Sequence, residues 1–485
     1  MSERYYLELS EAGGGSHKFY EVLVDGRTMT IRYGRIGDSG QTSSKEFATP
    51  EAAKAEALKK ANEKRRKGYE DAVVGVRKKR SVTRRAIPST PSGGGGSRSS
   101  RSSTPVALAP VLWKFATGSS AFGIFIDDDC CWVGNQDGMV YCLNHNGEVV
   151  RQYRLPEGVK CIVSDGDWLY AGCDDGNVYD LSGKVPTVAY EIDDSVDIYW
   201  IDIHDGVLAV SDNAGNVTAI NHEDESQWTR KSAGGGGWMV RCDEIGVYHG
   251  HGQGVTMYDW EDGTMLWHRP TNGSVLFGWQ ETSHVFAGTS GGTVAAFSKG
   301  GDPGVVANCD GGVFSCAAAE DGKYIFAGDS SSTVYCFDAT GKRLWRLGSG
   351  CGSAFSMQFH KDRVYIVTTD GSLACIDASE EAIKAAKGGV VPTRRDIKAE
   401  AAAASLSVTD SIGTTGEVGA GVIVECVKVA GKLRVRAASE GYNSSWNVQF
   451  PKNLREEGAR FVVDELREAG RGGFYRAHGE IKRLL

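Results

Sequence analysis

The residue types that most often carry catalysis are present in this chain, but not in a catalytic spacing. Cys130 and Cys131 are adjacent thiols, and His249 and His251 flank a glycine in a predicted turn, where polar residues are common. No Ser/His/Asp set and no pair of carboxylates can be assigned from spacing. We therefore predict that this protein is not an enzyme and that it has no cofactor.

Metal ligands are not indicated either. The 12 cysteines include no CxxC pair and no Cys/His cluster at zinc spacing, so we expect reduced, structural thiols. Asp-Gly pairs at 137–138, 175–176 and 370–371 suggest calcium at first sight. They are better explained as hairpin turns that need a positive φ angle.

Positive charge is concentrated near the N-terminus. Residues 1–110 carry a net charge of +9, residues 111–389 of −20 and residues 390–485 of +3, within a total of −8. A polyanion is attracted to the first block and repelled by the second, so nucleic-acid contact is expected in the first block and less in the last. The basic residues expected to follow phosphates are Lys64, Arg65, Arg66, Arg77, Lys78, Lys79 and Arg80. The alternative is a solvated face and tail, and in a eukaryote the same run is typical of a nuclear localisation signal.

The N-terminal block has a recognisable order of elements. Residues 19–24 and 28–32 read as paired strands, followed by Arg32-Tyr33-Gly34-Arg35-Ile36-Gly37, Gly40-Gln41 and Phe47. Thr49 caps a helix that starts at Pro50 and runs to about Lys67, before Gly68-Tyr69. Over residues 3–75 this order closely resembles the WGR domain, which is named for a Trp-Gly-Arg signature and is familiar from poly(ADP-ribose) polymerases.

The resemblance implies a DNA contact. In the polymerases the Trp packs against a terminal nucleotide at a strand break and the Arg meets phosphate. By resemblance, Tyr33 is the stacking surface, Gly34 the shared glycine and Arg35 the phosphate contact with DNA or RNA. Tyr33 stands where the family has Trp and offers less stacking area. The alternative is that Gly34 and Arg35 only shape a sheet corner, with Tyr33 in the core.

The middle of the chain is a repeat. Seven copies of strand, Gly-rich turn and strand end at residues 144, 182, 221, 259, 298, 338 and 377, at intervals of 38–40 residues. Alternation with period two around hairpin turns predicts a seven-bladed β-propeller over residues 111–389. Leu112-Trp113-Lys114-Phe115 is a spare strand, so we expect it to complete the last blade and close the ring.

Each copy tends to continue with Gly and then Trp or another aromatic residue. Gly263-Thr-Met-Leu-Trp267 and Gly341-Lys-Arg-Leu-Trp345 are examples. This resembles the PQQ-like (quinoprotein) repeat more than the WD repeat. Quinoprotein dehydrogenases use a vicinal Cys pair, but they are exported, usually have eight blades and hold calcium. Here Cys130-Cys131 begins a repeated strand, so two ordinary strand residues are the favoured interpretation, and a quinone or small-molecule enzyme is the weaker alternative.

The remaining segments are predicted to be linkers and a small C-terminal domain. Residues 81–110 read as a basic Gly/Ser-rich linker and 390–410 as a second linker or short helix. Residues 411–485 are predicted to form a small α+β domain of unknown family, with strands at 422–429, 433–437 and 446–450 and a helix from Asn453 to Gly470. Its arginines 434, 436, 455, 460 and 467 are more simply solvated charges than a second nucleic-acid face.

The predicted fold is therefore multidomain and mainly β, with a small α/β WGR-like domain at residues 1–80. We predict a non-enzymatic adaptor that contacts DNA, at ends or breaks in a DNA damage response, and presents the propeller to an unknown protein partner. The alternative is a protein-interaction scaffold that does not bind DNA. No apolar run approaches the length of a membrane span and the N-terminus lacks a signal-peptide pattern, so we expect an intracellular soluble protein, in the cytoplasm or nucleoid of a bacterium or the nucleus of a eukaryote.

Overall fold

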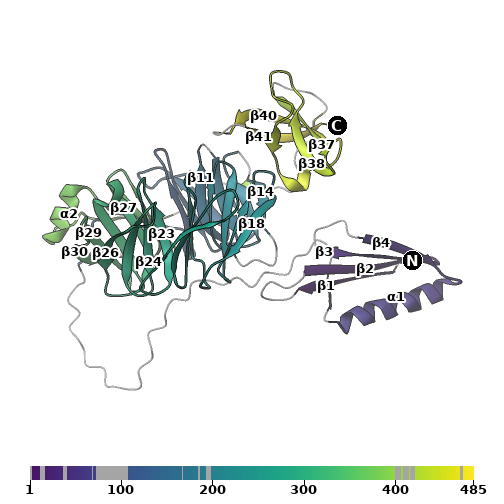
Figure 1. The fold of residues 1–485 in the computed structure, drawn as a ribbon, viewed down its shortest axis with the longest axis horizontal. Helices are drawn as coiled ribbons and strands as arrows, with labels where there is room; N and C mark the ends of the chain where they lie inside the picture. The colour runs from purple at the N-terminus through teal and green to yellow at the C-terminus, as the bar shows by residue number, and fades with distance from the viewer. Residues whose placement is uncertain are drawn as a thin grey trace, which may run out of the picture. The chain divides into compact units, whose positions relative to one another are not determined.

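The computed structural model describes most of the chain. It covers residues 3–10, 17–35, 41–67, 69–72, 107–166, 168–183, 186–192, 198–398, 406–407, 414–415, 421–469 and 473–484. The described residues form two units, one up to residue 72 and one from residue 107 onward, which are described separately (Figure 1). Within those residues, no helix is long and apolar enough to cross a membrane.

The N-terminal unit is one sheet with one helix against it. The sheet has the order β4-β3-β2-β1-β5, and helix α1 packs on β1, β2 and β3. Its elements are β1 (Glu3–Ser10), β2 (His17–Asp25), β3 (Thr28–Arg35), β4 (Gln41–Glu46), α1 (Pro50–Arg65) and β5 (Glu70–Asp71). The predicted hairpin and helix are confirmed.

Helix α1 begins where the capping residues predict. The Thr49 hydroxyl accepts a hydrogen bond from the Ala52 N–H at 3.2 Å and satisfies one of the free donors of the first turn. The buried face of α1 consists only of Ala53, Ala57 and Ala61, so the helix can lie close to the sheet. It covers a core of Leu7, Tyr20, Val22, Val24 and Met29.

The second unit contains seven sheets, each built on four antiparallel strands and called a blade below; the four are consecutive in the first six blades. The first three are β7 (Ala121–Ile126), β8 (Cys131–Asn135), β9 (Met139–Leu143), β10 (Val149–Arg154); β11 (Val159–Asp165), β12 (Trp168–Cys173), β13 (Asn177–Asp180), β14 (Thr187–Glu191); and β15 (Ile198–His204), β16 (Val207–Asp212), β17 (Asn216–Ile220), β18 (Ser226–Lys231). The next two are β19 (Met239–Cys242), β20 (Val247–His251), β21 (Gly254–Tyr258), β22 (Met265–Pro270); and β23 (Val275–Gln280), β24 (His284–Thr289), β25 (Thr293–Ser298), β26 (Pro303–Asn308). The last two are β27 (Val313–Ala319), β28 (Tyr324–Asp329), β29 (Thr333–Asp338), β30 (Arg343–Gly348), with a 3₁₀ turn at Glu320–Gly322; and β31 (Ala354–His360), β32 (Arg363–Thr368), β33 (Ser372–Asp377), β6 (Val111–Ala116).

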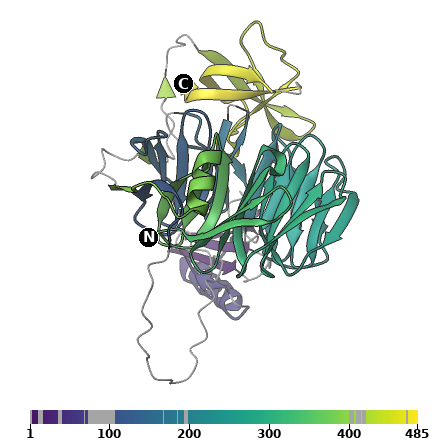
Figure 2. The same ribbon diagram turned by 90° about the vertical axis from the view of Figure 1, so that its left-hand side faces the viewer.

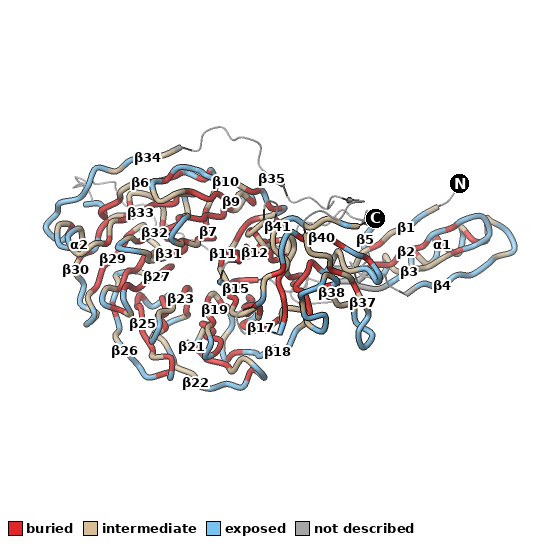
Figure 3. Tube along the Cα trace, turned by 90° about the horizontal axis from the view of Figure 1, so that it is seen from above, coloured by how far each residue is buried: buried red, intermediate tan, exposed pale blue. Residues whose placement is uncertain are grey.

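These sheets close into a seven-bladed β-propeller, as predicted. The first strand of each blade contacts the first strand of the next, and β31 of the last blade contacts β7 of the first. Strand β6 pairs antiparallel with β33, Trp113 opposite Cys375, and so completes the last blade with the earliest residues of the ring. Figure 3 shows the ring with its buried strands in red. The Asp-Gly pairs are tight turns as expected, with φ of 82° at Gly138 and 80° at Gly371.

The segment predicted to be a linker after the propeller is partly strand. Strand β34 (Arg395–Lys398) runs parallel to β6 and adds a fifth strand to the last blade, and β35 (Leu406–Ser407) pairs in parallel with β10. Before them, Ser379 caps the helix α2 (Glu380–Lys387), its hydroxyl accepting from the Ala382 N–H at 3.3 Å. The outer edge left by β6 is therefore covered by a later piece of the same chain.

The C-terminal segment is a β-sheet, and the helix predicted from Asn453 to Gly470 is wrong. The sheet contains β36 (Thr414–Thr415), β41 (Phe474–Leu484), β40 (Arg460–Glu468), β37 (Val422–Val429) and β38 (Lys432–Ala437), with β39 (Asn447–Gln449) paired to β41 (yellow in Figure 2). Only a 3₁₀ turn, Lys452–Leu454, is helical among the described residues of this segment. The α+β prediction for this domain is corrected to a β-sheet.

A β-bulge explains why the sequence of β40 resembles a helix. The register of β40 against β41 shifts between Val463 and Glu465. Phe461, Val463 and Leu466 all pack in one core, so the buried spacing is two and then three residues. An extra residue in a bulge changes the strict alternation of a strand into a spacing that imitates a helical face.

The C-terminal sheet docks on the second and third blades. The Arg476 guanidinium pairs with the Asp165 carboxylate, Gln449 Nε2 donates to Tyr190 Oη at 2.8 Å, and the rings of Phe474 and His222 stack with centroids 3.9 Å apart. Two of the five arginines considered for a second nucleic-acid face form contacts between the C-terminal sheet and the third blade. Arg434, 11% exposed, pairs with Glu223 and Glu225, and Arg455 donates to the Glu223 carbonyl oxygen at 3.0 Å.

The docking site contains a carboxyl group that should make stability depend on pH. Burial raises the pKa of Asp224 to about 6, although the Lys452 Nζ lies 3.7 Å from Asp224 Oδ2. The folded state then binds the proton more tightly than the unfolded state, so this group lowers stability as pH rises from about 4 to about 6. Asp224→Asn should raise the free energy of unfolding at pH 7 by roughly 2–3 kcal/mol and change it little at pH 4. Denaturant unfolding of the wild type and of Asp224→Asn from pH 4 to 8 measures the difference in the free energy of unfolding. A difference that does not change with pH would contradict the assigned role of Asp224.

Candidate nucleic-acid interface

Tyr33 lies on the side of the sheet that faces α1. It stands opposite Tyr20 in the β2–β3 ladder, and the two ring centroids are 6.3 Å apart. The Tyr20 ring is buried in the core, whereas Tyr33 is 43% exposed. Tyr33 is therefore at the border of the core, with part of its surface available to a ligand.

A cation lies beside the two tyrosines. The Lys64 ammonium, near the end of α1, lies 4.4 Å from the centroid of the Tyr20 ring and 5.2 Å from that of Tyr69. These contacts hold the ammonium by cation–π attraction next to the aromatic group that includes Tyr33. Tyr20, Tyr33, Tyr69 and Lys64 together are called the Tyr33 cluster below. Such a cluster offers a stacking face and a positive charge side by side, which suits a nucleotide.

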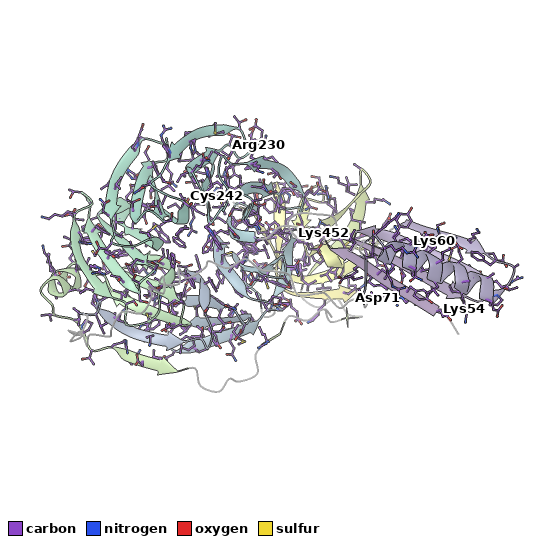
Figure 4. All side chains as sticks on the ribbon, turned by 90° about the horizontal axis from the view of Figure 1, so that it is seen from below. Lys54, Lys60, Asp71, Arg230, Cys242 and Lys452 are labelled. Carbon is purple, nitrogen blue, oxygen red and sulfur yellow. The ribbon has the colours of Figure 1, made fainter. Side chains whose placement is uncertain are left out.

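Arg65 forms an ion pair within the domain. Its guanidinium forms a two-point pair with Asp71, at 2.9 Å from Nε and 2.6 Å from Nη2, and Nη1 donates to Asn62 at 2.7 Å. The hydrogen bonds from Arg65 lower the pKa of the Asp71 carboxyl. Arg65 thus ties the end of α1 to β5. Arg66 is exposed at the C-cap of α1. Figure 4 labels Lys60 and Asp71 on this unit.

Several predicted contact residues lie outside the part of the chain that the structure describes. Gly34 and Arg35 belong to β3, where they pair with Phe19 and Lys18, but the Arg35 side chain lies outside the described residues. The basic run Arg77, Lys78, Lys79 and Arg80 also lies outside them. Of the predicted contact residues, Tyr33 and Lys64 both lie beside the Tyr20 ring.

The opposite face of this sheet carries a charged network that the sequence analysis missed. Glu21 is buried and accepts from Arg4 Nε at 2.6 Å and from Arg32 Nε at 2.8 Å. The Arg32 guanidinium lies 5.1 Å above the Phe19 ring, which stacks on Tyr6. Glu21 lies directly opposite Arg32 in the β2–β3 ladder, whereas Arg4 lies two residues along β1 from Tyr6, the residue opposite Glu21. Arg32 is engaged within the domain even though it lies next to Tyr33 in sequence.

The vicinal cysteines of the propeller are held in the blade. Cys131 is buried, its Sγ lies 3.6 Å from His145 Nδ1, and that nitrogen lies 2.8 Å from Tyr365 Oη. Burial raises the pKa of the Cys131 thiol to about 12, so it is protonated at neutral pH and a poor nucleophile. Both cysteines are free thiols. Cys131 is thus an ordinary strand residue of β8, as interpreted from the sequence, whereas Cys130 directly precedes that strand.

The paired histidines are not turn residues, which corrects the sequence analysis. His249 and His251 belong to β20 and are fully buried. Thr256 Oγ1 lies 2.9 Å from His251 Nε2 and 2.9 Å from His268 Nδ1. Burial lowers the pKa of His249 to about 3 and that of His251 to about 4, so both are neutral core residues.

The fold and the site define a protein with a small sheet-and-helix module followed by a β-propeller. Residues 3–75 match the WGR domain, and residues 305–384 match the family of the outer membrane protein assembly factor BamB, a PQQ-like repeat family. The chain therefore carries a WGR domain and a propeller of PQQ-like repeats, as the resemblance implied.

Two solved structures similar to the chain have low sequence identity to it. A computationally designed protein, Ika8, has a TM-score of 0.46, and the WD40 propeller domain of Doa1 has one of 0.48. Each is 12% identical, they cover 56% and 57% of this chain respectively, and 99% of each is covered. No curated protein matches the chain significantly.

Proposed function

We propose that this protein is a non-enzymatic adaptor that binds DNA, at ends or breaks, through its WGR domain and holds a partner protein on its propeller. The observation that supports DNA contact is the Tyr33 cluster, in which a half-exposed aromatic ring lies in one aromatic group with the Lys64 ammonium. The ring can stack on a base or sugar, and the ammonium can meet a phosphate. The acidic ring of blades repels a polyanion and suits a protein partner better.

Loss of the Tyr33 ring should weaken DNA binding selectively. Stacking on an aromatic side chain contributes about 1–3 kcal/mol per base, so Tyr33→Ala in the full-length protein should reduce affinity for nicked and blunt duplexes by roughly 5- to 100-fold. Tyr33→Trp should restore or strengthen binding because the larger ring offers more contact area. Fluorescence anisotropy across a salt series on nicked, blunt and intact duplexes measures these affinities.

Matched lysine variants separate the Tyr33 cluster from general positive charge. Lys64→Gln and Lys59→Gln remove the same charge from α1, but the Lys59 ammonium pairs with Glu56 and its side chain is 64% exposed. Lys64→Gln should weaken binding more than Lys59→Gln does. If both lysine variants weaken DNA binding equally and binding shows no preference for ends or nicks, the interaction is nonspecific electrostatic attraction. Absence of binding at low salt would favour the second candidate, a protein scaffold in which the smaller Tyr33 has replaced a DNA-binding Trp.

A further inference from the structure

The axis of the propeller contains a cavity of about 360 Å³. First strands of six blades line it: β7, β11, β15, β19, β23 and β31. This volume is within the range of small-molecule sites in proteins. Figure 4 labels Cys242, one of its lining residues, on β19.

The first strands of the blades share a repeated structural feature at the opposite end of the axis. Six of the seven first strands have a register shift of the bulge type at their second residue, and in the fourth blade Trp238 directly precedes β19. The residues at these positions are Phe122, Lys160, Tyr199, Trp238, Leu276, Phe314 and Phe355. Phe122 stacks on Phe355 and Tyr199 on Trp238, with centroids 4.6 and 3.6 Å apart. A small cavity of about 20 Å³, room for roughly one water, is lined by five of them: Phe122, Lys160, Tyr199, Trp238 and Phe355.

Arg241 is the basic residue of the larger cavity with unused donors. Its Nε donates to the Gly278 carbonyl oxygen at 2.9 Å, and its guanidinium carbon lies 5.5–5.9 Å from the ring centroids of Trp200, Phe277 and Trp279. Among the described residues, neither terminal nitrogen of Arg241 has a hydrogen-bond or ion-pair partner. The aromatic rings and the Nε bond hold the guanidinium in place, which leaves two parallel donors for a ligand.

Aromatic side chains form part of the wall around Arg241. Trp200, Phe277 and Trp279 line the cavity, and their rings surround the guanidinium. The terminal donors of Arg241 call for a ligand that accepts hydrogen bonds, and the rings call for an apolar body on that ligand.

The acidic residues of the pocket are engaged elsewhere. Asp165 pairs with Arg476, Asp243 pairs with Lys299, and Asp202 accepts from the Cys242 N–H at 2.9 Å. Burial raises the pKa of Asp202, which favours its neutral form. The Arg241 charge is therefore not cancelled by a direct ion pair, and a single guanidinium matches a singly charged, planar anion.

We propose that the axial cavity of the propeller binds a carboxylate carried on an apolar body, with the two terminal nitrogens of Arg241 donating to its oxygens and the aromatic walls packing on the body. This site is independent of the DNA contact proposed for the WGR domain.

Calorimetric titration of the full-length protein with 3-phenylpropionate tests the proposal. Its neutral isostere, 3-phenylpropionamide, should bind at least tenfold more weakly, since it lacks the charge. Arg241→Gln should reduce affinity for the acid at least tenfold, and Asp202→Asn should not weaken it. Peptides ending in Phe with a free or an amidated C-terminus distinguish a protein terminus from a small molecule as the source of the carboxylate.

Arg269→Gln is the matched control. Arg269 lies in β22 of the same blade, its Nε donates to the Gly301 carbonyl oxygen at 2.5 Å and its guanidinium lies 5.9 Å from the Trp267 centroid, but it does not line the cavity. This variant should bind the acid within twofold of the wild type. Equal binding of acid and amide, binding unaffected by Arg241→Gln, or no binding of the acid at 10 mM would overturn the proposal. Should Arg241→Gln fail to fold, Arg241→Lys keeps the charge without the two-donor fork and should still weaken binding several-fold.

Discussion

Trp113→Ala should lower the free energy of unfolding of the propeller by about 3–5 kcal/mol, as expected for removal of a buried tryptophan. Trp113 is 3% exposed, its Nε1 donates to the His145 carbonyl oxygen at 3.1 Å, and its ring packs edge-on against Tyr365. It lies in β6, the strand that joins the first residues of the ring to its last blade. The substitution therefore creates a cavity at the closure of the ring.

A tryptophan of the same type elsewhere in the ring supplies the comparison. Trp267 Nε1 donates to the Lys299 carbonyl oxygen at 3.0 Å, 32 residues further on, as Trp113 does to His145. Trp267→Ala should lower the free energy of unfolding, measured with denaturant, by a similar amount. Only Trp113→Ala should speed hydrogen exchange in β6 and β33, because only that residue holds the closing strand. A loss below about 1 kcal/mol, or equal exchange in both variants, would contradict this account of closure.

Arg476→Met should lower the free energy of unfolding by about 3–5 kcal/mol, because it leaves the largely buried Asp165 carboxylate, 11% exposed, without its cationic partner. Arg476 is 3% exposed, its guanidinium pairs with Asp165, and it lies 4.6 Å from the Trp168 ring centroid. This pair joins the C-terminal sheet to the second blade. Denaturant unfolding measures the loss, and limited proteolysis should show the C-terminal sheet released before the ring unfolds.

A double variant and a neighbouring arginine test the cause. Arg476→Met combined with Asp165→Leu should recover part of the loss, since an apolar pair can replace a buried ion pair at little cost. Arg467→Met removes an arginine that pairs with the exposed Glu465 at 3.0 Å and should cost less than about 1 kcal/mol. If Arg476→Met behaves like Arg467→Met, the buried pair does not hold the C-terminal sheet in place.

Local patterns in the sequence were sufficient to predict the two main folds. The 38–40-residue interval predicted seven blades, and the spare strand around Trp113 predicted how the ring closes. Thr49 and Pro50 predicted the start of α1. These features depend on neighbouring residues and on a repeated period, so they can be read without knowing which distant segments meet.

Tertiary structure decided the contacts between residues far apart in sequence. Arg476 and Asp165 are 311 positions apart, and the aromatic rings around Arg241 come from different blades, so no local motif marks either group. The bulge in β40 gave a helical spacing to a strand, because its pairing with β41 determines which residues are buried. In the same way, Lys64 and Arg65 are adjacent on one helix, yet the first lies beside the tyrosines and the second binds Asp71. Which partner each side chain meets depends on its direction from the helix and on the strands packed there, and residue type alone does not contain that information.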